Sequence, residues 1–248
     1  MTQKDFVFGL QSVVETLKSD QTIDRILVQQ ELSTSTKMQE VNRLAKDKRI
    51  FISKVPLAKL NRVTMKNHQG VIAFISAVPF IPLSHVVPGI FEQGLNPLFV
   101  ILDRITDVRN FGAICRTAEC AGVQAVILPQ RGAAQINSDA LKTSSGALNH
   151  IPVCKEEDLR QTLDYLRQSG LQIVACTEKA AQSLYEIDMT GPTAILMGSE
   201  EDGISPNLLE KADFRAKIPL LGKIASLNVS VAAGVVMYEA LRQRIGEA

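Results

Sequence analysis

Three short segments of this sequence place polar side chains where an apolar run ends. In the first, Asn110, Gly112 and Arg116 form the pattern N-x-G-x-x-x-R behind the apolar run PLFVILD. Asparagine can accept hydrogen bonds from the free amides at a helix start, and glycine permits a tight turn. An arginine inside that helix could bind a phosphate through two parallel hydrogen bonds. Taken alone, the segment also fits a capped helix with one surface arginine.

The second segment, ILMGSEEDGIS (195–205), ends its apolar run at Gly198 and continues with an acidic turn that contains Glu200, Glu201 and Asp202. Three carboxylates at a strand end can bind magnesium, orient a base or form a solvated turn. This segment alone leaves all three interpretations open.

The third segment, KIPLLGKIASLNVSVAAGVV (217–236), contains a loop with Gly222, after which Ser226, Leu227 and Asn228 open a helix. The amides and carbonyls of such a loop can hold the edge of an adenine without any charged side chain. Ser226 could equally serve only as a helix N-cap.

A parallel sheet would bring these three segments together. Residues 97–248 contain short apolar runs that alternate with helical stretches, which is typical of parallel strands buried on both faces. Ligands of open α/β sheets bind at the carboxyl ends of the strands, where all three segments lie. The sequence contains no G-x-G, which excludes the glycine-rich phosphate loop of dinucleotide folds. The predicted strands are PLFVILD, QAVILP, LQIVACT, TAILMGS and FRAKIPL.

The first 76 residues form a separate, basic part of the chain. They contain 12 lysines and arginines against 7 aspartates and glutamates, whereas residues 77–248 contain 15 against 19. The asymmetry indicates that the first part faces a polyanion, although ordinary solvated side chains would give the same counts. Alternating helix and strand patterns predict a small α/β sandwich here. Four prolines lie within 76–97, and we interpret residues 77–96 as a semi-rigid linker without helix or central strand.

Composition excludes several classes of protein. The 248 residues are 46% hydrophobic and 21% charged, and no apolar run approaches the roughly 18 residues of a membrane span. The N-terminus lacks the regions of a signal peptide, so we expect a cytoplasmic protein. The four cysteines form no C-x-x-C pair and the three histidines are scattered. We therefore expect no structural metal, and no disulfide in a reducing compartment.

Taken in order, the three segments resemble the three motifs of the TrmH-like (SpoU) branch of the SPOUT methyltransferase superfamily. The resemblance covers about residues 97–248, and SLNVSVA is its most specific part. FGLQSVVETL near the start and NHQGVIAF (67–74) resemble the RNA-binding extension of bacterial 23S ribosomal RNA guanosine-2′-O-methyltransferases. That extension is similar to a small ribosomal-protein fold. The resemblance thus divides the chain into an RNA substrate-binding domain (1–76), the linker (77–96) and a methyltransferase domain (97–248).

The resemblance implies a fold and a site that spacing does not reveal. It implies a C-terminal trefoil knot that holds S-adenosylmethionine, and a homodimer packed through the knot region. One departure is the turn SEEDG, which is more acidic than the usual Glu-Gly-x-Gly; Glu200 matches the family position, and the roles of Glu201 and Asp202 stay open. Carried onto this chain, the cofactor is held by main chain around Leu196, Gly198, Ile218 and Leu227, and the reacting centre is lined by Asn110, Arg116, Glu200, Ser226 and Asn228.

The function that follows is methyl transfer from S-adenosylmethionine to a ribose 2′-hydroxyl, with a guanosine of 23S rRNA as the favoured substrate. A tRNA ribose or another ribosomal nucleotide is the first alternative. A non-catalytic RNA-binding protein that keeps the fold is the second. A small-molecule methyltransferase, the third, would leave the basic N-terminal domain without a purpose.

The resemblance assigns activation of the acceptor hydroxyl to Arg116. The motifs contain no histidine to act as a base, and the pKa of arginine lies above about 12. We therefore expect Arg116 to stabilise the developing alkoxide and a neighbouring phosphate, and to act as a base only if burial lowers its pKa. Asn110 is expected to orient its guanidinium, and Glu200 to anchor the first and second motifs to each other. No metal is required.

Overall fold

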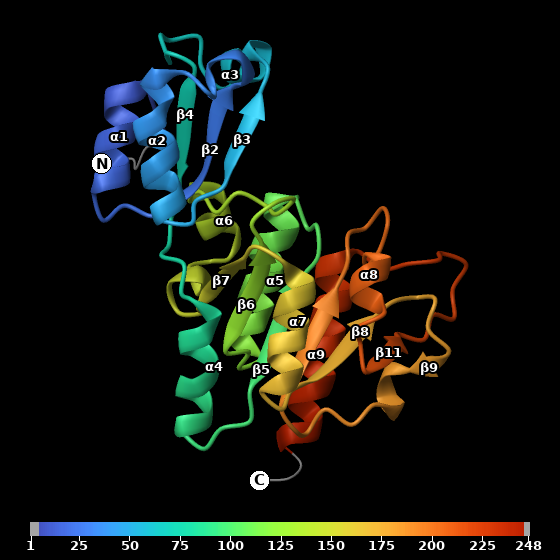
Figure 1. Ribbon diagram of the computed structural model, residues 1–248. Coiled ribbons are helices and arrows are strands. Elements are labelled where there is room, and N and C mark those ends of the chain that lie inside the picture. Colours follow the sequence, from blue (N-terminus) through green and yellow to red (C-terminus); the bar gives the residue numbers. More distant parts are fainter. Residues whose placement is uncertain (1–4, 246–248) are drawn as a thin grey trace. The chain divides into compact units, whose positions relative to one another are not determined.

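The predicted apolar runs form a parallel sheet in the computed structural model, which describes residues 5–245 (Figure 1). The chain divides into two units: one runs to Pro79 and includes Gln135–Ser138, and the other holds Phe80–Ala134 and the chain from Asp139 onward. The second unit contains a seven-stranded sheet whose order is β7-β6-β5-β10-β8-β11-β9. Its strands are β5 (Leu98–Leu102), β6 (Ala125–Pro129), β7 (Val153–Glu156), β8 (Gln172–Cys176), β9 (Gln182–Ser183), β10 (Thr193–Met197) and β11 (Phe214–Lys217).

All neighbouring strands of this sheet pair in parallel. Every residue of β5 and β10 is buried, as the continuous apolar runs predict. The two strands lie side by side with Met197 opposite Leu102, so their carboxyl ends finish at the same level. The predicted mixed α/β fold with a mostly parallel sheet is therefore confirmed, whereas the trefoil knot stays a prediction.

Helices cover both faces of the sheet (Figure 1). On one face, apolar side chains of α4, α7 and α8 pack against alternate residues of β5, β6, β8 and β10. On the other face, α5 and α9 pack against each other and α9 contacts β10. None of the helices in the described part of the chain is long and apolar enough to cross a membrane. The helices of this unit are α4 (Leu83–Glu92), α5 (Val108–Cys120), α6 (Ser138–Thr143), α7 (Leu159–Gln168), α8 (Pro206–Leu209) and α9 (Val229–Ile245), with 3-10 turns at Ala147–Asn149 and Leu184–Glu186.

The stretch interpreted as a linker contains a helix, which corrects that prediction. Helix α4 occupies ten residues of it, with Pro88 inside. Leu83, Val87 and Ile90 recur at helical spacing, and all three are buried against the sheet. Burial of this apolar face offsets the backbone hydrogen bond that Pro88 cannot donate. Proline content alone was therefore a misleading signal here.

The first unit is the predicted α/β sandwich. Its four-stranded sheet has the order β1-β4-β2-β3, in which only β2 and β3 pair in parallel. Helices α1 and α2 bury an apolar cluster on one face, and α3 lies with a smaller cluster that includes Leu60 and Phe74. The three-residue strand β1 was too short to predict. The elements are β1 (Phe6–Phe8), α1 (Leu10–Lys18), β2 (Ile23–Gln29), a 3-10 turn (Gln30–Leu32), α2 (Thr36–Asp47), β3 (Ile52–Val55), α3 (Leu57–Val63) and β4 (Val71–Ile75).

Arg244 fastens the last turn of α9 to the start of the sheet. Its guanidinium donates hydrogen bonds to four main-chain carbonyls, those of Met189 (2.9 Å), Gly191 (2.6 Å), Asn96 (2.9 Å) and Pro97 (3.2 Å). Burial lowers the pKa of Arg244, but the group stays charged at any physiological pH.

We expect Arg244→Ala to lower the free energy of unfolding by about 2–3 kcal/mol, because four carbonyls lose their donor. Arg244→Lys should recover less than half of that loss, since one ammonium cannot reach carbonyls that a planar fork spans. Guanidinium-induced unfolding of the full chain measures both. The exposed Arg160, whose side chain has no partner among the described residues, provides the control Arg160→Ala. A lysine variant as stable as wild type would contradict this account.

Candidate active site

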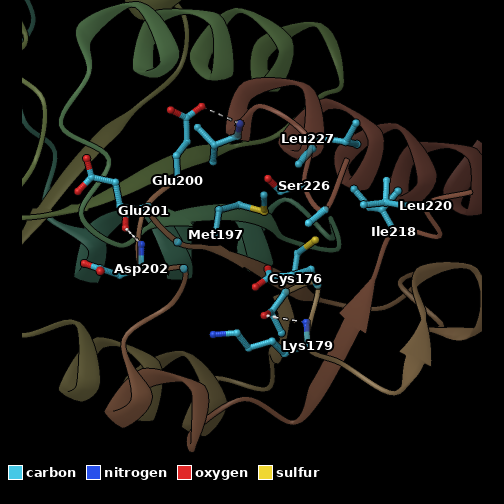
Figure 2. Close-up of a pocket in the computed structure, with 18 residues that line it drawn as sticks. Cys176, Lys179, Met197, Glu200, Glu201, Asp202, Ile218, Leu220, Ser226 and Leu227 are labelled. Carbon is cyan, nitrogen blue, oxygen red and sulfur yellow. Dashed lines mark hydrogen bonds between the residues drawn. The ribbon is translucent and has the colours of Figure 1, made fainter. Parts of the chain in front are cut away.

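A cavity of about 250 Å³ lies beyond the carboxyl ends of β10, β8 and β11 (Figure 2). The chain before α9 closes it. Figure 2 shows the acidic side chains of Glu200, Glu201 and Asp202 on one side and the apolar side chains of Ile218, Leu220 and Leu227 on the other. The site therefore occupies the sheet edge at which the three polar segments were predicted to meet.

A tight reversal of the main chain forms the acidic side of the cavity. Ser199 and Gly203 exchange two main-chain hydrogen bonds, of 3.2 and 3.0 Å, across the acidic turn. The main chain of Gly203 lies so close to Gly198 that a Cβ at Gly198 would overlap it. Only glycine fits at residue 198, and its absent side chain lets the turn fold back onto the end of β10.

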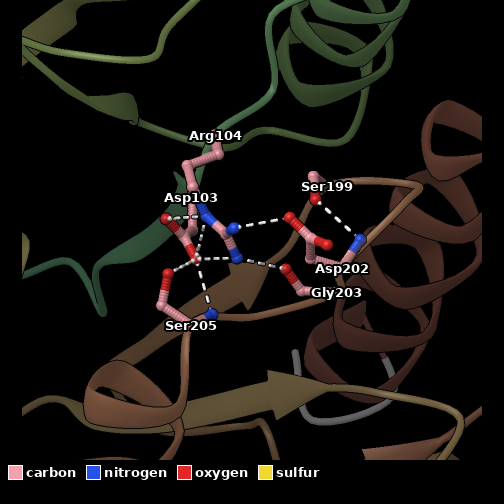
Figure 3. Close-up of polar contacts among 6 residues, drawn as sticks. All are labelled: Asp103, Arg104, Ser199, Asp202, Gly203 and Ser205. Carbon is pink, nitrogen blue, oxygen red and sulfur yellow. Dashed lines mark hydrogen bonds and ion pairs between the residues drawn. The ribbon is translucent and has the colours of Figure 1, made fainter.

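Two residues directly behind β5 hold this turn in place (Figure 3). Asp103 is 4% exposed, and its carboxylate accepts hydrogen bonds from the main-chain amide (2.7 Å) and the hydroxyl (2.6 Å) of Ser205. Arg104 donates to Asp202 (2.9 Å) and to the carbonyl of Gly203 (3.0 Å). Arg104 has a φ of 58°, in the left-handed region that side chains other than glycine rarely adopt. Asp202, whose role the sequence left open, thus forms an ion pair with Arg104 at this turn.

Sequence reasoning missed Asp103 and Arg104, although Asp103 ends the predicted strand PLFVILD and Arg104 directly follows it. Their position behind β5 was a usable signal, because polar residues at that edge of a parallel sheet face the ligand site. Glu201, by contrast, makes no hydrogen bond or ion pair with any described residue.

The side chain of Asn228 connects all three predicted segments. Its amide donates hydrogen bonds to the carboxylate of Glu200 (2.5 Å) and to the side-chain oxygen of Asn110 (3.0 Å). Its own oxygen accepts from the amide and hydroxyl of Ser230, which caps the start of α9. The same Glu200 oxygen accepts from the amide of Val229 at 3.2 Å. Glu200 therefore anchors the second segment to the third, and reaches the first only through Asn228.

Helix α5 begins earlier than the sequence predicted, and this frees Asn110. The N-cap is Asp107, whose carboxylate accepts hydrogen bonds from the amides of Arg109 (2.8 Å) and Asn110 (2.9 Å). The Asn110 side chain is not needed as a cap and bonds to Asn228 instead. An aspartate can accept hydrogen bonds from helix-start amides as well as an asparagine can. Residue type alone therefore could not show whether Asp107 or Asn110 is the N-cap.

Arg116 does not contact the other predicted catalytic residues. It is exposed on α5, and within residues 5–245 its side chain makes no hydrogen bond or ion pair. Six residues separate Arg116 from Asn110, which places them about a third of a turn apart around the helix. The expected orientation of the guanidinium by Asn110 is therefore absent from this structure, and the guanidinium is free to meet a substrate.

The predicted cofactor residues lie at the cavity with one exception. Gly198, Ile218 and Leu227 line it, as do Ser226 and Glu200 of the predicted reacting centre. Leu196 is fully buried inside β10 and its side chain does not line the cavity; Met197, the next residue, does. Asn110, Arg116 and Asn228 lie outside the lining.

The carboxyl end of β8 and the loop that follows it form a further wall of the cavity, which the sequence did not predict. Cys176, Thr177, Glu178 and Lys179 line the cavity from this side. Burial raises the pKa of the Cys176 thiol to about 12, and the Glu178 carboxylate contributes to the rise, so the thiol stays protonated. Lys179 is the one basic side chain among the described lining residues. The polar residues that follow the predicted strand LQIVACT were the signal that could have found this wall.

The cavity suits a ligand that is partly apolar and carries positive charge. Met197, Ile218, Leu220 and Leu227 supply apolar contacts beside main-chain groups of the loops. Four carboxylates against one lysine make the lining acidic. No group of three side chains able to hold a metal ion occurs within residues 5–245. An adenosyl group bearing a sulfonium and an ammonium fits this combination of walls and charge.

Comparison with known proteins decides between the chemistries that such a site allows. Residues 97–238 match the SpoU rRNA Methylase family, and residues 6–80 match the RNA 2′-O ribose methyltransferase substrate binding family. The chain belongs to the SpoU rRNA methylase family. The chain is therefore an RNA 2′-O-ribose methyltransferase, and its first unit is of the substrate-binding type.

Full-length relatives support this membership. The chain is 37% identical over 99% of both chains to a putative TrmH family tRNA/rRNA methyltransferase, YacO, of Bacillus subtilis. It is 34% identical to a Staphylococcus saprophyticus protein described as a putative TrmH family tRNA/rRNA methyltransferase, over 96% of this chain and 95% of that one.

Two solved structures share the fold. The SpoU methyltransferase AviRb of Streptomyces viridochromogenes, determined with AdoMet, superposes with a TM-score of 0.61 at 24% identity over 97% of this chain and 90% of that chain. The TrmH/SpoU tRNA modifying enzyme of A. aeolicus is 32% identical over 65% of this chain and 86% of that chain, with a TM-score of 0.57.

We expect Asn228→Asp to destabilise the protein in a pH-dependent way. The variant removes the donor to Asn110 and sets a second carboxylate against Glu200, which costs about 1–2 kcal/mol at about pH 7.5. The two carboxylates lie side by side in the folded state only, and protonation of either one removes their repulsion. The folded state then binds a proton more readily than the unfolded state, so the deficit should shrink as the pH falls to about 4.5.

Urea unfolding of wild type and variant at both pH values measures this difference. Asn149→Asp, at an exposed residue outside the site, makes the same change of charge and controls for it. If the loss in free energy of unfolding is equal at both pH values, Glu200 does not interact electrostatically with the side chain at residue 228.

Proposed function

We propose that this protein methylates the ribose 2′-hydroxyl of a guanosine in 23S rRNA. The observation that carries the proposal is the junction of Asn110, Glu200 and Asn228 beside an acidic, adenosyl-sized cavity. The methyl donor is S-adenosylmethionine, and membership of the SpoU family supports the reaction. The finer assignment to 23S rRNA and to guanosine rests on the basic N-terminal unit and on its resemblance to the ribosomal RNA enzymes.

The cofactor is proposed to bind through main chain at Gly198, Ile218 and Leu227, with the chain at Leu196 forming the strand behind them. S-adenosylmethionine, when bound, supplies a methyl group on a sulfonium that needs little further activation. Ser226 and Glu200 line the same cavity. The carboxylates of the acidic turn attract the cationic ligand, and Lys179 is available for its carboxylate.

The acceptor requires more help than the donor, because a ribose hydroxyl is a weak acid that must lose its proton as it attacks. Arg116 is proposed to bind a phosphate next to the target ribose and to stabilise the oxygen as negative charge develops. Its freedom from any partner among the described residues leaves all its donors available. Asn110, Glu200 and Asn228 fix the ends of α5, β10 and α9 around the reacting centre.

We expect Arg116→Lys to be nearly as damaging as Arg116→Ala. If Arg116 must hold a phosphate and the attacking hydroxyl in fixed relative positions, a lysine cannot copy its planar fork. Both variants should lose about 10²–10³-fold in the rate of methyl transfer and lie within roughly tenfold of each other. Because Arg116 is exposed and has no partner within the described chain, stability and S-adenosylmethionine affinity should not change.

Single-turnover methyl transfer at saturating RNA measures this rate separately from binding. Arg109→Lys, on the same helix, is the matched control. A lysine variant that keeps more than about a third of the wild-type rate would show that positive charge suffices.

A tRNA ribose is the second candidate substrate. A solved relative is described as a tRNA modifying enzyme, and another as acting in 2-OH methylation of C/U34 on tRNA. Ribosomal RNA is favoured here because the substrate-binding unit in residues 6–80 is basic and resembles that of the ribosomal RNA enzymes. Labelled methyl transfer to 23S rRNA and to bulk tRNA, followed by nuclease digestion, distinguishes the two. The proposal requires 2′-O-methylguanosine from 23S rRNA; label in tRNA alone would reject it.

We further propose that the protein is a homodimer that packs through α9 and the chain before it. Leu221 is fully exposed and Ile224 is 78% exposed. Val231 and Tyr238 are exposed on α9 seven residues apart, and therefore on one face of the helix. Exposed apolar side chains gathered in this way are typical of a subunit interface.

The double variant Leu221→Asp/Ile224→Asp should convert the dimer to a folded monomer, because two carboxylates would be buried without partners. Sedimentation velocity measures the change in mass. Leu95→Asp alters an exposed leucine on another loop and should leave the dimer intact. A wild-type protein that sediments as a monomer at micromolar concentration would reject the proposal.

A further inference from the structure

The first unit contains a second cavity, of about 820 Å³, between the loop 66–70 and the start of α2. Lys37 and Met38 line it from the start of α2, and Lys66, Asn67 and Gln69 from the loop. Leu10, Gln29 and Leu32 also line this cavity. None of the residues considered for catalysis or cofactor binding belongs to this unit, so the cavity has no role yet in the proposed reaction.

The loop 66–70 is held rigidly by buried and strained groups. His68 is 7% exposed; its Nδ1 accepts a hydrogen bond from the amide of Gly70, and its Nε2 lies 3.0 Å from the side-chain oxygen of Asn61. Gln69 adopts a φ of 51°, and its side-chain oxygen accepts from the amide of Leu10 at 3.0 Å. Strained backbone that persists because its surroundings fix it is concentrated at binding sites.

The walls of the cavity combine positive charge, amides and apolar surface. The ammonium groups of Lys37 and Lys66 have no hydrogen-bond or ion-pair partner among the described residues, and no carboxylate from that part of the chain lines the cavity. The side-chain amides of Asn67 and Gln29 are likewise unpaired within residues 5–245. Leu32, 37% exposed, offers an apolar face. The ligand should therefore carry a phosphate, a hydrogen-bonding edge and a flat apolar surface.

We propose that this cavity binds one unpaired nucleotide of the RNA substrate. Lys37 and Lys66 hold its phosphate, Asn67 and Gln29 bind the edge of its base, and the base lies against Leu32. A base inside a helix presents neither its face nor its pairing edge, so the subsite selects single-stranded or looped RNA. The inference rests on the proposed function, because RNA is the ligand, and it adds the feature of the RNA that the first unit recognises.

Binding of a labelled single-stranded RNA of about twelve nucleotides to the full chain tests this, with the same sequence as a duplex for comparison. We expect Lys37→Ala/Lys66→Ala to weaken single-strand binding at least about tenfold. The slope of log Kd against log salt should fall by about 0.7 for each phosphate that the variant no longer binds. Lys46→Ala/Lys54→Ala removes the same charge from exposed residues outside the cavity and should change Kd by less than about twofold.

A second variant tests the space of the cavity independently of its charge. Thr36 is exposed at the first position of α2 and lines the cavity, so Thr36→Trp fills the space without changing charge. It should weaken single-strand binding about tenfold while leaving the salt slope unchanged. Equal S-adenosylmethionine affinity and melting temperature in all variants would show that folding is intact.

The outcomes distinguish this inference from the proposed function. Wild-type protein that methylates no RNA would reject the proposed function. An active wild type whose Lys37→Ala/Lys66→Ala and Thr36→Trp variants bind single strands as the control does would overturn the subsite. Duplex RNA that binds as tightly as single strands, and that the variants weaken equally, would also overturn it, because the cavity would then recognise phosphates alone.

Discussion

One amide group joins the parts of this enzyme that must act together. Asn228 donates to Asn110 and to Glu200, and its oxygen caps the helix that follows. Segments far apart in the sequence, from α5 to α9, thereby meet at one edge of the parallel sheet. Because Asn228 contacts both Asn110 and Glu200, a shift of the third segment breaks the contacts to the other two. The adenosyl cavity and the start of α5 are fixed relative to each other by this junction.

Contacts between the end of β5 and the acidic turn support this junction. The buried Asp103 holds Ser205, and Arg104 holds Asp202 and Gly203, so the acidic turn is fixed at its far end. Gly198 allows the near end to return onto the strand. Such support is what keeps a reacting group within the narrow limits that catalysis needs. Arg116, in contrast, has no hydrogen-bond or ion-pair partner within the described chain, and its substrate contact stays a proposal.

Local patterns in the sequence predicted those features that depend on neighbouring residues. Continuous apolar runs predicted β5, β6, β8, β10 and β11. The resemblance to the SpoU family, rather than a local pattern, implied that Gly198, Ser226 and Leu227 belong to one site, and all three line the cavity. Pairings between distant residues carry no such signal. Nothing local indicates that Asp103 binds Ser205, or that Asn110 bonds to Asn228 rather than to Arg116. Helix α4 was missed for another reason: the cost of Pro88 was weighed without the burial of Val87 and Ile90.

The most direct test of the account is a map of 2′-O-methyl groups in the RNA of cells with and without this gene. The account predicts that one guanosine of 23S rRNA loses its methyl group in the deletion strain. Wild-type protein should restore it, and Asn228→Asp, which breaks the junction, should restore it poorly. An unchanged 23S rRNA map, or a methyl group lost from tRNA alone, would contradict the central claim.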